Sequence, residues 1–165
     1  MNILRVLPLI LSLAACAPSG THSEPGEIAA DTQCELDGMI LADYPGPKGQ
    51  ILYADGSTAW FCDTVELLSI YLNPEQIRRV NGAYTQDMAK TDWEAPSGHW
   101  IGIEQAYFVQ DSSLLGSMGP TLASFASRAD AEAFARKYGG KVLAFAEITP
   151  ELVRLDGGVR HDSHM

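Results

Sequence analysis

The feature that most constrains the fold of this chain is a repeated order of elements. Between residues 50 and 84, apolar periodicity and turn residues predict two strands, a helix and a third strand. The same order returns between residues 100 and 148. Each half has only about 55 residues and would bury little surface alone, so the halves should pack together. We therefore predict an α+β fold of two similar ββαβ units packed against each other.

In the first unit, the local signals place each element boundary. The expected elements are strands at 50–54, 58–62 and 78–84, with one helix after residue 63. Asp55-Gly56 predicts a hairpin turn between the first two strands. Asp63 can cap the helix, and Glu66, three residues on, would complete a capping box. Asn73-Pro74 should end the helix.

The second unit repeats these signals. Its expected elements are strands at 100–109, 121–126 and 141–148, with a loop at 111–119. Ser127 caps the predicted helix, with Asp130 three residues on. Gly139-Gly140 should terminate that helix, because glycine readily adopts the backbone conformation of a helix C-terminus.

The first fifteen residues have the pattern of a targeting segment. Arg5 precedes an apolar run, Leu7–Leu13, and at roughly ten residues this region is too short to span a bilayer. It ends in Leu13-Ala14-Ala15-Cys16, which resembles the bacterial lipobox, where the cysteine is lipidated and the chain is cut before it. An ordinary signal peptide with a chance cysteine is the alternative. We predict a periplasmic protein anchored to a membrane through Cys16, with the outer membrane favoured.

Composition sets the remaining boundaries and excludes one class of partner. The expected organisation is a signal peptide at 1–15, a flexible tether at 16–32, ββαβ units at 33–95 and 96–155, and a flexible tail at 156–165. The formal net charge is −10, with no basic run. Nucleic acid would be repelled by such a chain, whereas cations are mildly favoured.

Three sulfur-containing side chains suggest a site for a soft metal ion. Cys34 and Met39 stand close together in Cys34-Glu35-Leu36-Asp37-Gly38-Met39, and Met118 lies between glycines in Gly116-Ser117-Met118-Gly119-Pro120. A thiolate and thioethers together prefer Cu(I) over hard ions such as Mg²⁺. We predict that Cys34, Met39 and Met118 bind Cu(I). In the alternative interpretation Met39 belongs to the core and Met118 is a surface or hinge residue.

The other candidate ligands are weaker. Cys62 could form a disulfide with Cys34 or remain a separate thiol. Because it follows Ala59-Trp60-Phe61, we expect a buried thiol with no metal role and no bond to Cys34. Four histidines could complete a site, although each is more simply a solvent-exposed bystander: His22, His99, His161 and His164.

Sequence signals of catalysis are missing. The chain has no Gly-x-Ser-x-Gly, Cys-x-x-Cys or His-Glu-x-x-His motif and no phosphate-binding glycine loop. We therefore predict a non-enzyme. Two rival classes remain open: a thiol–disulfide protein that uses Cys34 and Cys62, and a non-metal scaffold lipoprotein that docks onto an enzyme.

Several segments in order resemble the NosL family, the nitrous oxide reductase accessory lipoproteins. The matching segments are Cys34 to Met39, Asp43-Tyr44-Pro45-Gly46-Pro47-Lys48-Gly49-Gln50-Ile51, Gly116 to Pro120, and Phe125 to Ile148 with its Ala-Glu-Ala-Phe helix. The lipobox agrees with them. The resemblance covers most of the chain, from Cys34 to Ile148.

The resemblance implies a periplasmic Cu(I) chaperone. Such a protein would supply copper for the copper–sulfur centre of nitrous oxide reductase, working with the membrane maturation machinery. It also implies two ββαβ units distantly like organomercurial lyase. One position departs from the family pattern: some members carry a cysteine two residues before the matching methionine, where this chain has Asp37. Asp37 would then be a hard donor in its place or an acceptor behind the ligands.

Overall fold

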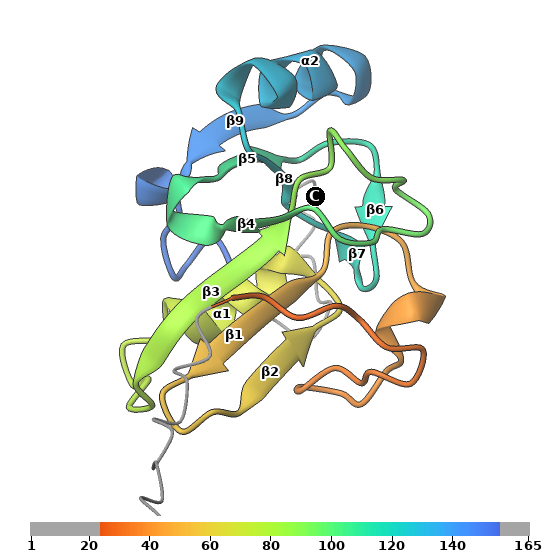
Figure 1. Ribbon diagram of the computed structural model, residues 1–165. Coiled ribbons are helices and arrows are strands. Elements are labelled where there is room, and N and C mark those ends of the chain that lie inside the picture. The colour runs from red at the N-terminus through yellow and green to blue at the C-terminus, as the bar shows by residue number, and fades with distance from the viewer. Residues whose placement is uncertain (1–23, 156–165) are drawn as a thin grey trace, which may run out of the picture.

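The structure, a computed structural model, describes residues 24–155. Its elements form two larger antiparallel sheets, each with one helix, and a two-stranded hairpin, and this confirms the α+β fold of two similar ββαβ units (Figure 1). The predicted signal peptide, the lipidation site Cys16, the residues His22, His161 and His164, and the tail at 156–165 lie outside the described residues. No helix among the described residues is long and apolar enough to cross a bilayer.

The first sheet has the strand order β2-β1-β3-β4. Its strands are β1 (Gly49–Tyr53), β2 (Thr58–Phe61), β3 (Val80–Gln86) and β4 (Trp100–Gly102). Helix α1 (Thr64–Tyr71) follows β2 and packs on β1 and β2. Its cap is as expected, because Asp63 Oδ1 accepts a hydrogen bond from Val65 N at 2.8 Å. The carboxylate of Glu66 does not complete the expected capping box and instead reaches Cys34.

The second sheet repeats this arrangement in the order β8-β5-β9. Its strands are β5 (Tyr107–Gln110), β8 (Ala123–Phe125) and β9 (Lys141–Ala144), and helix α2 (Arg128–Tyr138) lies across it (Figure 1). Ser127 Oγ accepts a hydrogen bond from Asp130 N at 3.2 Å, so the predicted cap is present. Gly139 ends the helix with a φ of 77°.

Three regions differ most from the sequence prediction. The expected strand at 100–109 is divided into β4, a 3-10 turn η2 (Ile103–Gln105) and β5. β4 pairs with β3, so the chain crosses from the first sheet to the second at η2, where Ile103 is buried in the core. The expected loop at 111–119 holds a small hairpin of β6 (Leu115–Gly116) and β7 (Gly119–Pro120). β9 stops at Ala144, where η3 (Phe145–Glu147) begins.

The two units share one hydrophobic core. Its buried residues come from both sheets and from α1, including Ile51, Phe61, Leu68, Phe108 and Leu143. The end of β3 also joins β8 through hydrogen bonds, among them Met88 N to Ser124 O at 2.9 Å and Ser124 Oγ to Gln86 O at 2.7 Å. Neither unit is therefore packed independently.

The segment before the first sheet lies across the face opposite α1. Gly26 and Gln50 exchange two hydrogen bonds of 2.9 Å and 3.0 Å, and strand alternation turns Gln50 away from the helix. This segment, red and orange in Figure 1, then passes the end of β2 and continues into the 3-10 turn η1 (Leu41–Asp43). Contacts with the sheet thus begin within the range 16–32 that the sequence assigns to the tether. They bring Cys34 beside β2.

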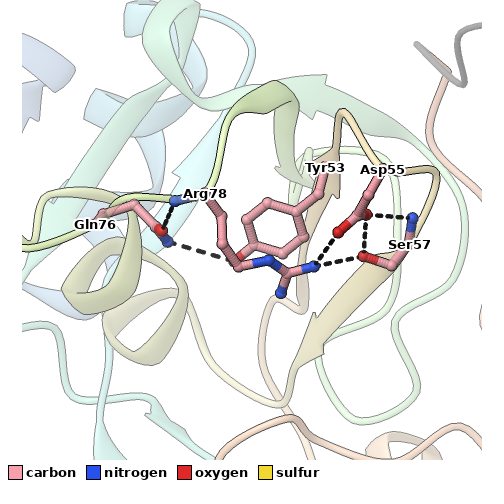
Figure 2. A network of polar contacts seen from close by, with 5 residues as sticks. All are labelled: Tyr53, Asp55, Ser57, Gln76 and Arg78. Carbon is pink, nitrogen blue, oxygen red and sulfur yellow. Dashed lines mark hydrogen bonds and ion pairs between the residues drawn. The ribbon is translucent and has the colours of Figure 1, made fainter.

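A polar network fixes the opposite end of this sheet. The Arg78 guanidinium lies over the ring of Tyr53, 3.4 Å from the centroid, and pairs with Asp55 Oδ2 at 3.1 Å (Figure 2). Arg78 also donates to Ser57 Oγ, and Gln76 accepts from the backbone N of Arg78. The network joins the β1–β2 turn to the segment before β3. It lies at the end of β1 and β2 that is remote from Cys62.

Candidate metal centre

Three potential ligand atoms meet where β2 gives way to α1. They belong to Cys34, Cys62 and Glu66, and all three lie within 4.8 Å of one another. We refer to these three residues as the donor group. Cys62 directly follows β2, and Glu66 lies in the first turn of α1. All three side chains are buried, with exposed fractions of 4% for Cys34, 0% for Cys62 and 5% for Glu66.

A tight turn positions Cys34 against β2. Cys34 N donates to Met39 O at 2.8 Å, and Gly38 N donates to Cys34 O at 3.0 Å. Gly38 has a φ of 76°, which glycine adopts without steric cost. Glu35 N donates to Trp60 O at 2.8 Å and so fastens this turn to β2. The location of Cys34 therefore depends on both a local turn and a pairing with a distant strand.

Met39 lies at the edge of the donor group. It is half-buried and packs against the small apolar cluster of Cys34, Leu41 and Cys62. Asp37 Oδ1 accepts a hydrogen bond from Met39 N at 2.9 Å, so this carboxylate orients the Met39 backbone. This hydrogen bond is consistent with the second role considered for Asp37, an acceptor behind the candidate ligands.

The two cysteines are free thiols, and their pKa values are shifted in opposite directions. The hydrogen bond from Cys62 lowers the pKa of Cys34 to about 6, against the opposing effect of burial. The same hydrogen bond, together with burial, raises the pKa of Cys62. Near neutral pH, Cys34 is therefore a thiolate and Cys62 holds its proton. A thiolate is the form that binds metal.

Glu66 contributes a protonated carboxyl to this arrangement. Burial, and then the negative charge of Cys34, raise the pKa of Glu66 to about 8. Glu66 Oε2 lies 3.3 Å from Cys34 Sγ, at hydrogen-bonding distance. One proton lies between them: a neutral Cys34 thiol donates to the carboxylate, and the Glu66 carboxylic acid donates to the Cys34 thiolate. Near neutral pH the pKa directions favour the second form.

Lys48 brings a positive charge to the same place. Its side chain is only 1% exposed, and Nζ donates to the carbonyls of Pro45 at 2.9 Å and Cys62 at 3.2 Å. Its backbone is fixed to the end of β3, because Lys48 N donates to Gln86 Oε1 and Thr85 Oγ1 donates to Lys48 O. Burial lowers the pKa of Lys48 to about 8. Lys48 is therefore still mainly protonated at neutral pH.

Asp63 connects the donor group to the hairpin that carries Met118. Besides capping α1, Asp63 Oδ1 accepts a hydrogen bond from Thr121 Oγ1 at 2.8 Å, and its carboxylate also accepts from the backbone of Ser117. A side chain at Gly116 would collide with Asp63 Oδ2, so glycine allows the hairpin to lie this close. Asp63, which follows Cys62, thus holds Ser117, which precedes Met118.

The predicted ligands lie in different surroundings in the structure. Cys34 and Met39 lie in or beside the donor group, whereas Met118 is 66% exposed at the turn of the β6–β7 hairpin. His99 is exposed, with a φ of 53°, and its carbonyl accepts a hydrogen bond from Asp87 N.

Sequence reasoning left Cys62 and Glu66 out of the site. The predicted burial of Cys62 is confirmed, and the structure places its thiol inside the donor group. The sequence pattern indicates Glu66 only as part of a helix cap. The available signal was spacing: a cysteine at the end of a strand, followed four residues later by a carboxylate in the first helical turn, places both at one corner.

Comparison with known proteins identifies the family. A family model described as NosL matches residues 25–153. This chain belongs to the NosL family. A NosL protein from Stutzerimonas stutzeri, named a copper-binding lipoprotein, is 41% identical over 139 residues, which is 84% of this chain and 73% of that relative. A relative of the same name from Achromobacter cycloclastes is 34% identical over 160 residues, covering 93% of this chain and 82% of the relative.

A solved NosL structure has the same fold. The crystal structure of the copper chaperone NosL from Shewanella denitrificans superposes with a TM-score of 0.73 at 39% sequence identity. The similarity covers 77% of this chain and 96% of that one. The two ββαβ units are thus shared with a NosL protein of known structure.

Proposed function

We propose that this NosL-family chain is a periplasmic lipoprotein that binds Cu(I) and passes it on as a chaperone. The observation that carries the proposal is the donor group, in which two free thiols are buried within 4.8 Å of each other and of a carboxyl group. Soft sulfur ligands in a buried site favour Cu(I). The relatives named copper-binding lipoproteins, and the solved copper chaperone, support copper as the cargo.

The proposed ligands differ in how readily each one can bind the ion. Cys34 supplies a thiolate that already exists near neutral pH, and Cys62 supplies a second sulfur once it loses its proton. Met39 adds a thioether from the rim of the apolar cluster. Glu66, a hard and protonated group, serves as hydrogen-bonding partner of the Cys34 sulfur.

Met118 is proposed as the ligand that exchanges copper with other proteins. It is exposed on a hairpin that Asp63 ties to the donor group, so its thioether can meet an ion before or after the buried sulfurs do. A thioether is a soft, neutral donor and binds Cu(I) without losing a proton. Ligand exchange would then move the ion between the surface and the interior.

The proposed destination follows from the family resemblance. The chain would deliver copper for assembly of the copper–sulfur centre of nitrous oxide reductase, together with the membrane maturation machinery. Lipidation at Cys16 would hold it on a membrane facing the periplasm, with the outer membrane favoured. Delivery by a carrier without catalysis is consistent with relatives named as copper-binding proteins and a copper chaperone.

Metal stoichiometry tests the proposal. The full chain, purified in detergent and kept reduced, should bind one equivalent of Cu(I) per molecule against a competing chelator. Cys34→Ser and Cys62→Ser should each lose most of this binding, while Arg78→Met, which alters the network at the far end of the sheet, should keep it. Copper binding that survives the loss of both cysteines would refute the site.

A thiol–disulfide function is the second candidate. It is favoured by the proximity of Cys34 and Cys62, which are both free. Burial of both sulfurs opposes it, since attack on a partner disulfide requires access. Counting free thiols after exposure to a mild oxidant separates the two functions: two thiols should persist in the copper-loaded chaperone, and none in a disulfide-forming protein.

A further inference from the structure

The donor group does not by itself specify a monovalent ion. Two cysteine sulfurs and a carboxyl group within 4.8 Å are also a suitable beginning for a tetrahedral zinc site. Zinc(II) and Cu(I) both bind thiolates, and ligand type alone separates them poorly. A protein that carries Cu(I) therefore needs something else in the site that disfavours divalent ions.

Lys48 has the properties of a group that disfavours divalent ions. Its ammonium is almost completely buried, and Nζ lies 3.2 Å from the carbonyl oxygen of Cys62. Among residues 24–155, no carboxylate lies within ion-pair distance of Nζ, whose hydrogen bonds go to two neutral carbonyls. The ionisable groups that interact with it through Coulomb forces are Cys34, Cys62, Asp63 and Glu66. Its charge is thus directed at the donor group without being cancelled by a direct partner.

The location of this charge is fixed by the fold. Lys48 immediately precedes β1, and its backbone is held on both sides at the end of β3, because Lys48 N donates to Gln86 Oε1 and Thr85 Oγ1 donates to Lys48 O. Nζ is held in turn by the carbonyls of Pro45 and Cys62. An ion that binds the sulfurs therefore cannot displace the ammonium without breaking its hydrogen bonds to both carbonyls.

We propose that Lys48 is a specificity-determining residue that makes the donor group select a monovalent over a divalent cation. The inference rests on the proposed function, because it concerns the same site. Coulomb repulsion from a fixed positive charge is twice as large for a divalent ion as for a monovalent one. Lys48 therefore opposes Zn²⁺ more than Cu(I), while the two sulfurs attract both.

Exchanging Lys48 for an uncharged residue tests this selectivity. The full chain, in detergent and reductant at neutral pH, is titrated with Cu(I) and separately with Zn²⁺, each against a chromophoric chelator. Because either ion displaces the Cys62 proton, Cu(I) adds no net charge to the site and Zn²⁺ adds one positive charge. Lys48→Met should therefore raise the affinity for Zn²⁺ and leave that for Cu(I) nearly unchanged. Even for charges roughly 10 Å apart at an effective dielectric constant of about 20, the preference for Cu(I) should fall by about tenfold or more.

Two further variants serve as controls for this measurement. Lys141→Met makes the same change at an exposed position at the start of β9, and it should leave the ratio of the two affinities unchanged. Lys48→Gln keeps an amide donor for the buried carbonyls and repeats the measurement if Lys48→Met does not fold, as judged by circular dichroism. Equal fold-changes for both ions in a folded variant, or an unchanged affinity for Zn²⁺, would overturn the role of Lys48. A wild-type chain that fails to bind Cu(I) would instead refute the proposed function.

Discussion

At the scale of single residues, the two thiols of the donor group differ in what they must give up to bind an ion. Cys34 is ionised at neutral pH because its pKa is lowered to about 6, mainly by a hydrogen bond from Cys62. Cys62 keeps its proton because its pKa is raised by the same contact and by burial. A metal ion bound by both sulfurs must therefore displace one proton above pH 6 and two protons below it.

The pH dependence of Cu(I) affinity should show this difference. From pH 8 down to pH 6, affinity should fall about tenfold per unit as the proton on Cys62 competes; below about pH 6, Cys34 is also protonated and the fall should steepen to about a hundredfold per unit. Competition titrations with a chelator at a series of pH values would measure the slopes. In Cys34→Ser the break near pH 6 should vanish. A flat profile above pH 6 would exclude Cys62 as a thiolate ligand.

The two methionines can be tested by a double-mutant cycle. Met39→Leu and Met118→Leu keep apolarity and approximate size while removing the sulfur, so each should weaken Cu(I) binding about tenfold with little change in melting temperature. Met88→Leu is the matched control, because Met88 is buried in a separate hydrophobic cluster with Val109 and Phe125. If both thioethers bind one ion, the double variant should lose less than the sum of the single losses. Wild-type affinity in Met118→Leu would leave Met118 a turn residue.

At the scale of elements, the corner between β2 and α1 has two structural tasks. Asp63 caps α1, which carries Glu66, and also accepts hydrogen bonds from the segment that carries Met118. Ser127 caps α2 in the second unit, and its hydroxyl bonds to Asp130. The two caps are equivalent in the repeat, but only the first adjoins the donor group.

Removing each cap should separate these tasks. Asp63→Ala should lower the free energy of unfolding by about 2 kcal/mol, because the cap and the contacts to the hairpin are lost together. Ser127→Ala should lower it by about 1 kcal/mol, the usual cost of losing a cap. Urea denaturation measures both values. Only Asp63→Ala should also weaken Cu(I) binding, and unchanged copper affinity in that variant would show that the hairpin is not needed for the site.

At the scale of the whole molecule, the remote ends of the first sheet are specialised differently. One end holds the donor group, Lys48 and the tie to the β6–β7 hairpin. The other end is closed by the Arg78 network, which is exposed and structural (Figure 2). The proposed copper exchange is therefore assigned to one end of the molecule, and substitutions at the other serve as controls for the site.

Anchoring is the prediction that concerns the whole protein in its compartment. Cys16→Ser should move the protein from the membrane fraction to the soluble periplasmic fraction, because each buried acyl CH₂ contributes about 0.8 kcal/mol and several chains together hold essentially irreversibly. Fractionation followed by immunoblotting measures the distribution. Copper binding by the released protein should match that of the anchored one. A serine variant that still sediments with membranes would contradict the lipobox assignment.

The sequence by itself determined the features that depend on neighbouring residues. The hairpin turn at Asp55-Gly56, the caps at Asp63 and Ser127 and the helix end at Gly139 are local, so periodicity and turn chemistry were enough to predict two ββαβ units. The soft character of the site was also readable, because donor chemistry belongs to the side chain of Cys34 itself.

Only the tertiary structure decided which residues share the site and what charge surrounds it. Cys34 and Glu66 are 32 residues apart, and they meet because the N-terminal segment pairs with β2 through the bond from Glu35 N to Trp60 O. Lys48 enters the same region because β3 fixes its backbone. β4 joins the first sheet because it pairs with β3 across the connecting segment 87–99. Such contacts arise from packing between segments, which a local pattern does not encode.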